Sequence, residues 1–201
     1  LISGGHGIDA AVFAGSQADY QFASSSDGLT IYVTDTRNNF VDTITGVESL
    51  RFDDGDIGVS LDTNGMVLTG SNGPDSIQVV GSIPITIKAG AGDDTVEGDT
   101  IDDLIFGQDG DDTIDGNAGD DVITGGAGDD TIDGGADNDI AIFAGNQADY
   151  TFESSADGLT VTITDTVNND VDTVTGVETL RFDDGDITVS HDTYLNQLVL
   201  T

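Results

Sequence analysis

The chain has 201 residues, of which 39 are acidic and 4 are basic, so its formal net charge is −35 at pH 7. A charge of this size opposes compaction unless cations offset it, and without a basic stripe we expect no nucleic-acid partner. The sequence has no cysteine, which excludes disulfides and thiolate metal sites, and no apolar run approaches the roughly 18 residues of a membrane span.

The chain carries a long internal repeat. Residues 4–60 align with residues 134–190 without a gap, and 40 of the 57 paired positions are identical. The chain therefore contains two copies of one module.

Each copy of the module has the pattern of β-strands. Apolar residues alternate with polar ones on both sides of Asp157-Gly158, and Asp184-Gly185 separates two further runs. The earlier copy repeats these pairs as Asp27-Gly28 and Asp54-Gly55. Because Asp-Gly between alternating runs is a hairpin signal, we expect four or five short antiparallel strands in each copy.

Between the two copies lies a short repeat. From residue 89 the chain divides into six units of nine residues, and glycine dominates the first and fourth positions. The eighth position is aliphatic in every unit. The sixth position is always aspartate: Asp94, Asp103, Asp112, Asp121, Asp130 and Asp139. An earlier unit at 70–78 places Asp75 in this position, and a degenerate ten-residue unit at 79–88 joins it to the main run. A lone match at 4–12 places Asp9 in the sixth position.

The nine-residue period predicts a coil. Glycines at positions one, two and four allow a tight turn, and the last three residues can form a short strand with its aliphatic side chain on one face. Two units then make one coil, so that units n and n+2 stack as parallel strands roughly 4.8 Å apart. The eighth-position aliphatics would fill a thin core.

This stacking brings sixth-position aspartates of successive coils close together. Like charges at such a distance repel unless a cation lies between them. Calcium fits best, because it accepts six to eight oxygens and uses backbone carbonyls, whereas zinc prefers nitrogen and sulfur and magnesium a smaller octahedral shell. We expect about four or five Ca²⁺ ions.

The pattern G-G-x-G-x-D-x-U-x, with U a large aliphatic, resembles the RTX (repeats-in-toxin, hemolysin-type) calcium-binding nonapeptides of bacterial proteins exported by type I secretion. The resemblance implies further ligands from turn carbonyls, while Ile101 and Asp137 depart from glycine at position four. The glycines concerned are Gly90, Gly92, Gly107, Gly110, Gly116, Gly119, Gly125, Gly126, Gly128, Gly134 and Gly135.

We therefore expect an all-β chain: a parallel β-roll of calcium-binding nonapeptides flanked by two duplicated antiparallel β modules. The expected boundaries are a first module at 1–69, which includes the lone nonapeptide, a roll at 70–142 and a second module at 143–201. "MVLT" at 66–69 leads into a repeat block and "LVLT" at 198–201 is the equivalent place, so we expect neighbouring modules of a longer chain.

The expected function is a calcium-binding module that folds after secretion, as a structural or adhesive segment of a larger bacterial surface or secreted protein. Extracellular polysaccharide is a candidate partner. The alternative is the calcium-dependent folding and secretion region of a type I secreted enzyme whose catalytic domain is absent here. His6 and His191 have Ala136 and Leu61 as duplicate partners and lack a nucleophile motif, so we expect no enzyme activity in this chain. The extracellular or cell-surface location is what the family resemblance implies.

Overall fold

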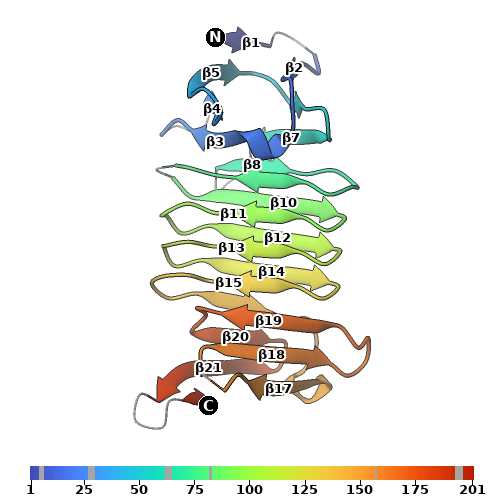
Figure 1. Cartoon of the computed structure of the whole chain (residues 1–201), viewed down its shortest axis with the longest axis vertical. Coiled ribbons are helices and arrows are strands. Elements are labelled where there is room, and N and C mark those ends of the chain that lie inside the picture. The colour runs from blue at the N-terminus through green and yellow to red at the C-terminus, as the bar shows by residue number, and fades with distance from the viewer. Residues whose placement is uncertain (5–6, 27–29, 62–64, 82, 157, 193–196) are drawn as a thin grey trace.

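A computed structural model gives the fold of the chain (Figure 1). It describes residues 1–4, 7–26, 30–61, 65–81, 83–156, 158–192 and 197–201. The described residues form β-strands and two three-residue 3₁₀ turns, η1 (Gln17–Asp19) and η2 (Gln147–Asp149). No helix in this part of the chain has the length and hydrophobicity to cross a membrane.

The largest sheet has eleven strands and runs the length of the molecule (Figure 1). Its middle strands pair in parallel, and antiparallel hairpins lie towards both ends. In spatial order the strands are β2 (Ala10–Val12), β6 (Ser49–Arg51), β7 (Asp56–Leu61), β8 (Met66–Thr69), β10 (Ile85–Ala91), β12 (Leu104–Asp109), β14 (Val122–Ala127), β16 (Ile140–Ile142), β20 (Thr179–Phe182), β21 (Gly185–Asp192) and β22 (Gln197–Leu200).

A seven-stranded sheet forms the opposite side of the coil, and a four-stranded sheet lies at the N-terminal end. The first consists of β17 (Tyr150–Ser154), β18 (Thr160–Asp165), β19 (Val171–Thr175), β15 (Thr131–Asp133), β13 (Thr113–Asp115), β11 (Thr95–Glu97) and β9 (Ser76–Gln78). The second consists of β1 (Ile2–Ser3), β5 (Phe40–Thr45), β4 (Thr30–Asp35) and β3 (Tyr20–Ser24).

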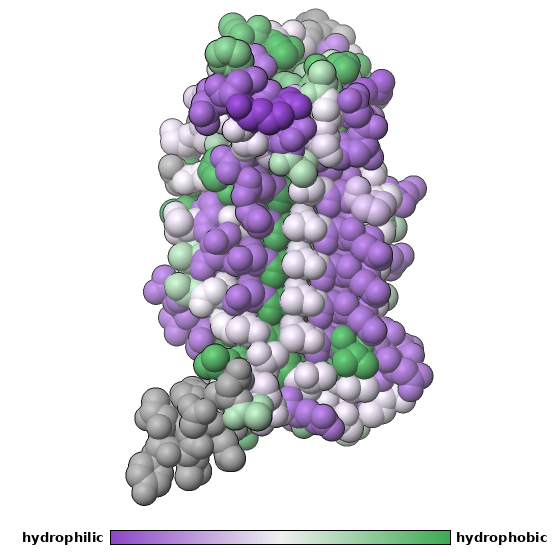
Figure 2. Space-filling model, viewed as in Figure 1, coloured by the Kyte–Doolittle hydropathy of each residue, from purple (hydrophilic) through white to green (hydrophobic). Residues whose placement is uncertain are grey.

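The nonapeptides stack with the register that their period predicts. Val96 on β11 pairs with Ile114 on β13, and Ile105 on β12 pairs with Ile123 on β14, in each case 18 residues apart. The eighth-position side chains are all buried between the two sheets: Val96, Ile105, Ile114, Ile123, Ile132 and Ala141. Figure 2 shows the outside of this coil, where hydrophilic residues form columns beside a narrow line of apolar atoms. The predicted parallel β-roll and the all-β class are confirmed.

Each flanking module contributes strands to two sheets. In the second copy, β17, β18 and β19 form an antiparallel meander that extends the seven-stranded sheet, while β20, β21 and β22 extend the eleven-stranded one. The hairpin turns at Asp54-Gly55 and Asp184-Gly185 lie where the pattern placed them, between β6 and β7 and between β20 and β21. His6, the Asp27-Gly28 turn and Asp157 lie outside the described residues.

The sheets are continuous where the modules meet the roll. β8 of the first module pairs in parallel with β10 of the roll, and β15 of the roll pairs in parallel with β19 of the second module. The expected boundaries at 69/70 and 142/143 stay a prediction; the eleven-stranded sheet crosses both of them, and the seven-stranded sheet crosses the second. The lone nonapeptide strand β2 pairs with β6, as β16 pairs with β20 in the later copy. One hydrophobic cluster includes residues of both modules and the roll.

Candidate calcium site

The sixth-position aspartates form two ladders, one on each side of the roll. In each ladder, Oδ1 of an aspartate accepts the backbone N–H of the residue at the same position one coil earlier. One ladder runs from Asp75 to Asp94 (2.7 Å), Asp112 (2.8 Å) and Asp130 (2.9 Å). The other runs from Ile85 to Asp103 (3.0 Å), Asp121 (2.7 Å) and Asp139 (2.8 Å). The pairs expected between successive coils are thus brought together.

The second carboxylate oxygen is the unusual feature of these ladders. Five ladder aspartates are at most 2% exposed, and their Oδ2 atoms are buried without any hydrogen-bond partner: Asp94, Asp112, Asp121, Asp130 and Asp139. A buried polar atom without a partner costs free energy. Five such atoms at one repeated position indicate a cation-binding site.

The glycines at position one shape the space that these oxygens face. A Cβ added to Gly107 would lie 2.2 Å from Oδ2 of Asp112 and 2.5 Å from the carbonyl oxygen of Gly125. A Cβ added to Gly116 would lie 2.4 Å from Oδ2 of Asp121 and 2.6 Å from the carbonyl oxygen of Gly134. A carboxylate oxygen and a carbonyl oxygen therefore face one small space that any side chain would fill.

The donor set fits calcium. No group of three or more Asp, Glu, His or Cys side chains that could hold a metal occurs among the residues that the structure describes. The oxygens beside the ladder carboxylates are backbone carbonyls, such as those of Gly125 and Gly134. Calcium accepts mixed carboxylate and carbonyl shells in flexible geometry. Gly107, Gly116, Gly125 and Gly134 all lie at position one beside a ladder carboxylate.

The other predicted glycines shape the turns. Those at positions two and four have a positive φ, between 99° and 132°, which favours glycine. At the same positions Gln108, Asn117 and Asp137 adopt positive φ without being glycine, so Asp137 keeps the turn despite its departure from the pattern. The glycines are Gly90, Gly92, Gly110, Gly119, Gly126, Gly128 and Gly135.

Burial raises the pKa of the ladder carboxyls. Desolvation is the largest cause at each one, ahead of repulsion from neighbouring carboxylates. It raises the pKa of Asp121 and Asp130 to about 7, and that of Asp94 and Asp139 to about 6. The pKa of Asp112 is also raised, for the same reason. Loss of water, more than the mutual repulsion expected from the sequence, is therefore what a bound cation has to offset.

Three predicted aspartates lie in different surroundings. Both oxygens of Asp75 have partners, Nε2 of Gln17 at 2.7 Å and the backbone N–H of Ser71. Oδ2 of Asp103 accepts the backbone N–H of Asp99 at 3.1 Å. Asp9 stacks on the first module, where its N–H donates to Oε2 of Glu48 at 2.8 Å. These three therefore differ from the five aspartates with an unpartnered oxygen.

The turn at 98–103 departs from the others. Asp99 and Ile101 replace glycine at positions two and four, and neither is among the residues with positive φ. Asp99 is buried and its own Oδ2 has no partner. This turn has a buried carboxylate at position two, where the other in-phase turns have glycine, glutamine or asparagine.

The structure adds ladder residues that the sequence argument missed. The N–H of Asp130 donates to Oδ1 of Asp172 at 3.0 Å, and the N–H of Asp139 donates to Oε2 of Glu178 at 2.9 Å. Both acceptors belong to the second module. A sequence signal for Asp172 exists, because "DTVTG" at 172–176 matches "DTIDG" at 112–116. The residues before Asp172, however, lack the glycine-rich turn that precedes each nonapeptide aspartate.

An outer ladder was also missed. Position-five residues connect coils in the opposite sense, since the N–H of Asp111 donates to Asp93 and that of Asp129 donates to Asp111. On the other side of the roll, the backbone N–H of Asp120 donates to Oδ1 of Asp102, and the backbone N–H of Asn138 donates to Oδ1 of Asp120. The paired aspartates of the "GDD" motif therefore divide into an outer, hydrogen-bonded ladder and an inner ladder that holds the unpartnered oxygens.

The repeat geometry agrees with a known family. Residues 86–105 and 106–141 match the model of the RTX calcium-binding nonapeptide repeat (4 copies). Residues 86–141 are RTX calcium-binding nonapeptide repeats. Calcium binding by this part of the chain follows from that match. All six in-phase aspartates lie within the matched RTX residues, whereas the units of Asp75 and Asp9 lie outside them.

Among solved structures, the chain is similar to the extracellular lipase LipA from Serratia marcescens, with 19% sequence identity and a TM-score of 0.36. The match covers 88% of this chain and 31% of the lipase chain, so the chain spans about a third of that protein. No curated protein matches the chain.

Proposed function

We propose that the chain is a calcium-dependent folding module, a structural or adhesive segment of a larger bacterial protein that is secreted or held at the cell surface. The five buried ladder oxygens without partners support this proposal most directly. They are costly without a cation, and backbone carbonyls beside them complete a calcium-like donor set.

The proposal assigns one ion to each unpartnered oxygen of the sixth-position ladders, at Asp94, Asp112, Asp121, Asp130 and Asp139. Calcium supplies the positive charge that these desolvated carboxylates lack. The chain's own residues hold the geometry: each Oδ1 is fixed by a backbone N–H, and the position-one glycines leave the space open. Five divalent ions offset 5 × 2 = 10 of the 35 net negative charges.

Binding energy available only to the coiled form becomes folding energy. Without calcium the inner ladder and the net charge both oppose the coil. We therefore propose that calcium-poor cytosol keeps the chain unfolded and suitable for type I export, and that calcium outside the cell folds it. We propose no catalytic role for these residues. Contact of the flanking modules with polysaccharide stays a prediction.

Far-UV circular dichroism and hydrodynamic radius, measured in chelator and in millimolar calcium, test the proposal. We expect an expanded chain with little β-structure in chelator and a compact β-rich chain in calcium. Magnesium at the same concentration is the control, and it should restore less structure because its octahedral shell is stricter. A compact β-rich chain in chelator would contradict the proposal.

A further inference from the structure

The duplicated module allows one face to be compared in two settings. In the first copy, this face consists of Gln17, Tyr20, Phe22 and Ile57, and all four are buried, at 0–5% exposure. In the second copy their partners are Gln147, Tyr150, Phe152 and Ile187, and none of these is fully buried. The same surface is therefore covered once and uncovered once.

The cover in the first copy is the beginning of the roll. Val79 forms a parallel bridge with Phe22, and the N–H of Val80 donates to the carbonyl of Phe22 at 2.8 Å. β8 of the same copy is covered in turn by β10. In the second copy, β17 is the edge of its sheet and β22 is the edge of the other.

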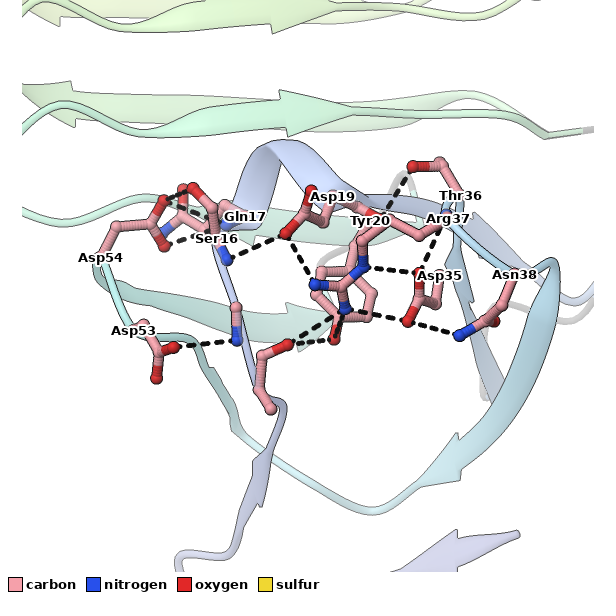
Figure 3. Close-up of polar contacts among 12 residues, drawn as sticks. Ser16, Gln17, Asp19, Tyr20, Asp35, Thr36, Arg37, Asn38, Asp53 and Asp54 are labelled. Atoms are coloured by element: carbon pink, nitrogen blue, oxygen red, sulfur yellow. Dashed lines mark hydrogen bonds and ion pairs between the residues drawn. The ribbon is translucent and has the colours of Figure 1, made fainter.

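Gln17 recognises the first ladder aspartate. Its Nε2 donates to Oδ1 of Asp75 at 2.7 Å, and its Oε1 accepts the N–H of Ser76 at 2.8 Å. Asp75 is the first aspartate of its ladder, so the glutamine amide supplies the donor that an earlier coil would otherwise supply. Figure 3 shows how the module fixes this residue: the backbone N–H of Gln17 donates to Asp54.

The second module fixes Gln147 in the same way. Gln147 opens the 3₁₀ turn η2 as Gln17 opens η1, and its N–H donates to Oδ1 of Asp184 at 2.9 Å. The neighbouring β22 is also more open than its counterpart, since Val199 is 36% exposed where Val67 is 5% exposed. The second module therefore presents Gln147 with its backbone held in place, the partly exposed rings of Tyr150 and Phe152, and the edge strands β17 and β22.

We propose that this face of the second module is the docking surface for another nonapeptide block, and that Gln147 recognises the first sixth-position aspartate of that block. The occupant is a segment with the features of residues 70–80: a G-x-x-G-x-D turn followed by a short strand that pairs beside Phe152. The covered duplicate in the same chain is what identifies this occupant. The inference rests on the proposed structural role and specifies how blocks and modules alternate.

The proposal can be tested by appending a nonapeptide block to the second module. Residues 70–142 are placed directly after Thr201, which is the duplicate of Thr69, and amide hydrogen exchange is measured in calcium. We expect exchange in β17 to slow towards the rate of β3 in the same molecule. Gln147→Ala should abolish this slowing in the extended chain and change little in the 201-residue chain. A folded appended block with β17 exchanging as before would overturn the proposal.

A second arm needs no appended block. In the 201-residue chain, Gln17→Ala should speed exchange in β9, because Asp75 and Ser76 lose the amide that holds them. Unchanged exchange in β9 would overturn recognition by glutamine, whatever the appended block does. Failure of calcium-dependent folding would instead be detected by circular dichroism of the unmodified chain, so the two failures are distinguishable.

Discussion

Asp121→Asn should destabilise the calcium-bound chain and not the calcium-free one. Asp121 is fully buried, its Oδ1 accepts the N–H of Asp103 at 2.7 Å, and its Oδ2 has no partner. Asparagine keeps an oxygen for that hydrogen bond and removes the charge. The new amide N–H₂ has an acceptor close by, since the carbonyl of Gly134 faces the same space.

The expected magnitude follows from the loss of one ion. A site whose free ligand exceeds its dissociation constant by about 100-fold stabilises the folded state by about 2.7 kcal/mol. For a chain of this size, each kcal/mol shifts the melting temperature by roughly 2–4 °C, so the variant should melt roughly 5–11 °C lower in calcium. In chelator the folded form of the variant should be as stable as that of the unmodified chain or more stable, because a buried carboxylate whose pKa is about 7 has been replaced by a neutral group.

Thermal unfolding followed by circular dichroism in saturating calcium measures the first effect, and the residual β-structure in chelator measures the second. Asp120→Asn is the matched control, because Asp120 is the adjacent residue, exposed, with Oδ1 accepting the N–H of Asn138. The control should change little both the melting temperature in calcium and the residual β-structure in chelator. An unchanged melting temperature of Asp121→Asn in saturating calcium would refute the assignment of Oδ2 as a calcium ligand.

The ladder geometry and the Arg37 ion pairs support three further predictions. In chelator, β-structure should increase as the pH falls from 8 to 5, because the raised pKa of Asp121, about 7, favours the folded state at low pH and this contribution is lost as the pH rises through 7; a decrease in ellipticity over this range would contradict it. Gly107→Ala should lower calcium affinity in a calorimetric titration, since its Cβ fills the space beside the ladder carboxylate, whereas Gly73→Ala, with nothing within 4 Å, should not; equal affinities would count against the cavity. Arg37→Val should speed amide exchange in the first module, because the guanidinium pairs with Asp19 and Asp35 (Figure 3) and Val167 fills this position in the second copy without such pairs; unchanged exchange would show that the ion pairs contribute nothing.

The periodic part of the fold could be predicted from the sequence. A strict spacing of nine residues fixes which side chains face inward, so Ile114 and Ile123 are buried as expected. Six repeated aspartates also fix which residues stack. Parallel pairing at a separation of 18 residues follows from two units per coil.

The partners of individual oxygens could not be predicted. Asp103 and Asp121 occupy the same position of the repeat, yet only Asp121 keeps an unpartnered oxygen. The backbone N–H of Asp99 donates to Asp103, whereas that of Asn117, at the same position in the unit of Asp121, donates to Asp115. Asp172 and Glu178 were missed because they continue the ladders without the glycine-rich turn. Hydrogen bonds between distant segments decide these cases, and they depend on backbone positions that a local pattern does not contain.

The most direct test of the account is the number of calcium ions bound by the folded chain. Native mass spectrometry after exchange into a volatile buffer with added calcium, alongside an Asp121→Asn sample, measures it. We expect five ions on the ladders of the unmodified chain and four on the variant. A folded chain that binds no calcium, or a variant that binds as many ions as the unmodified chain, would contradict it.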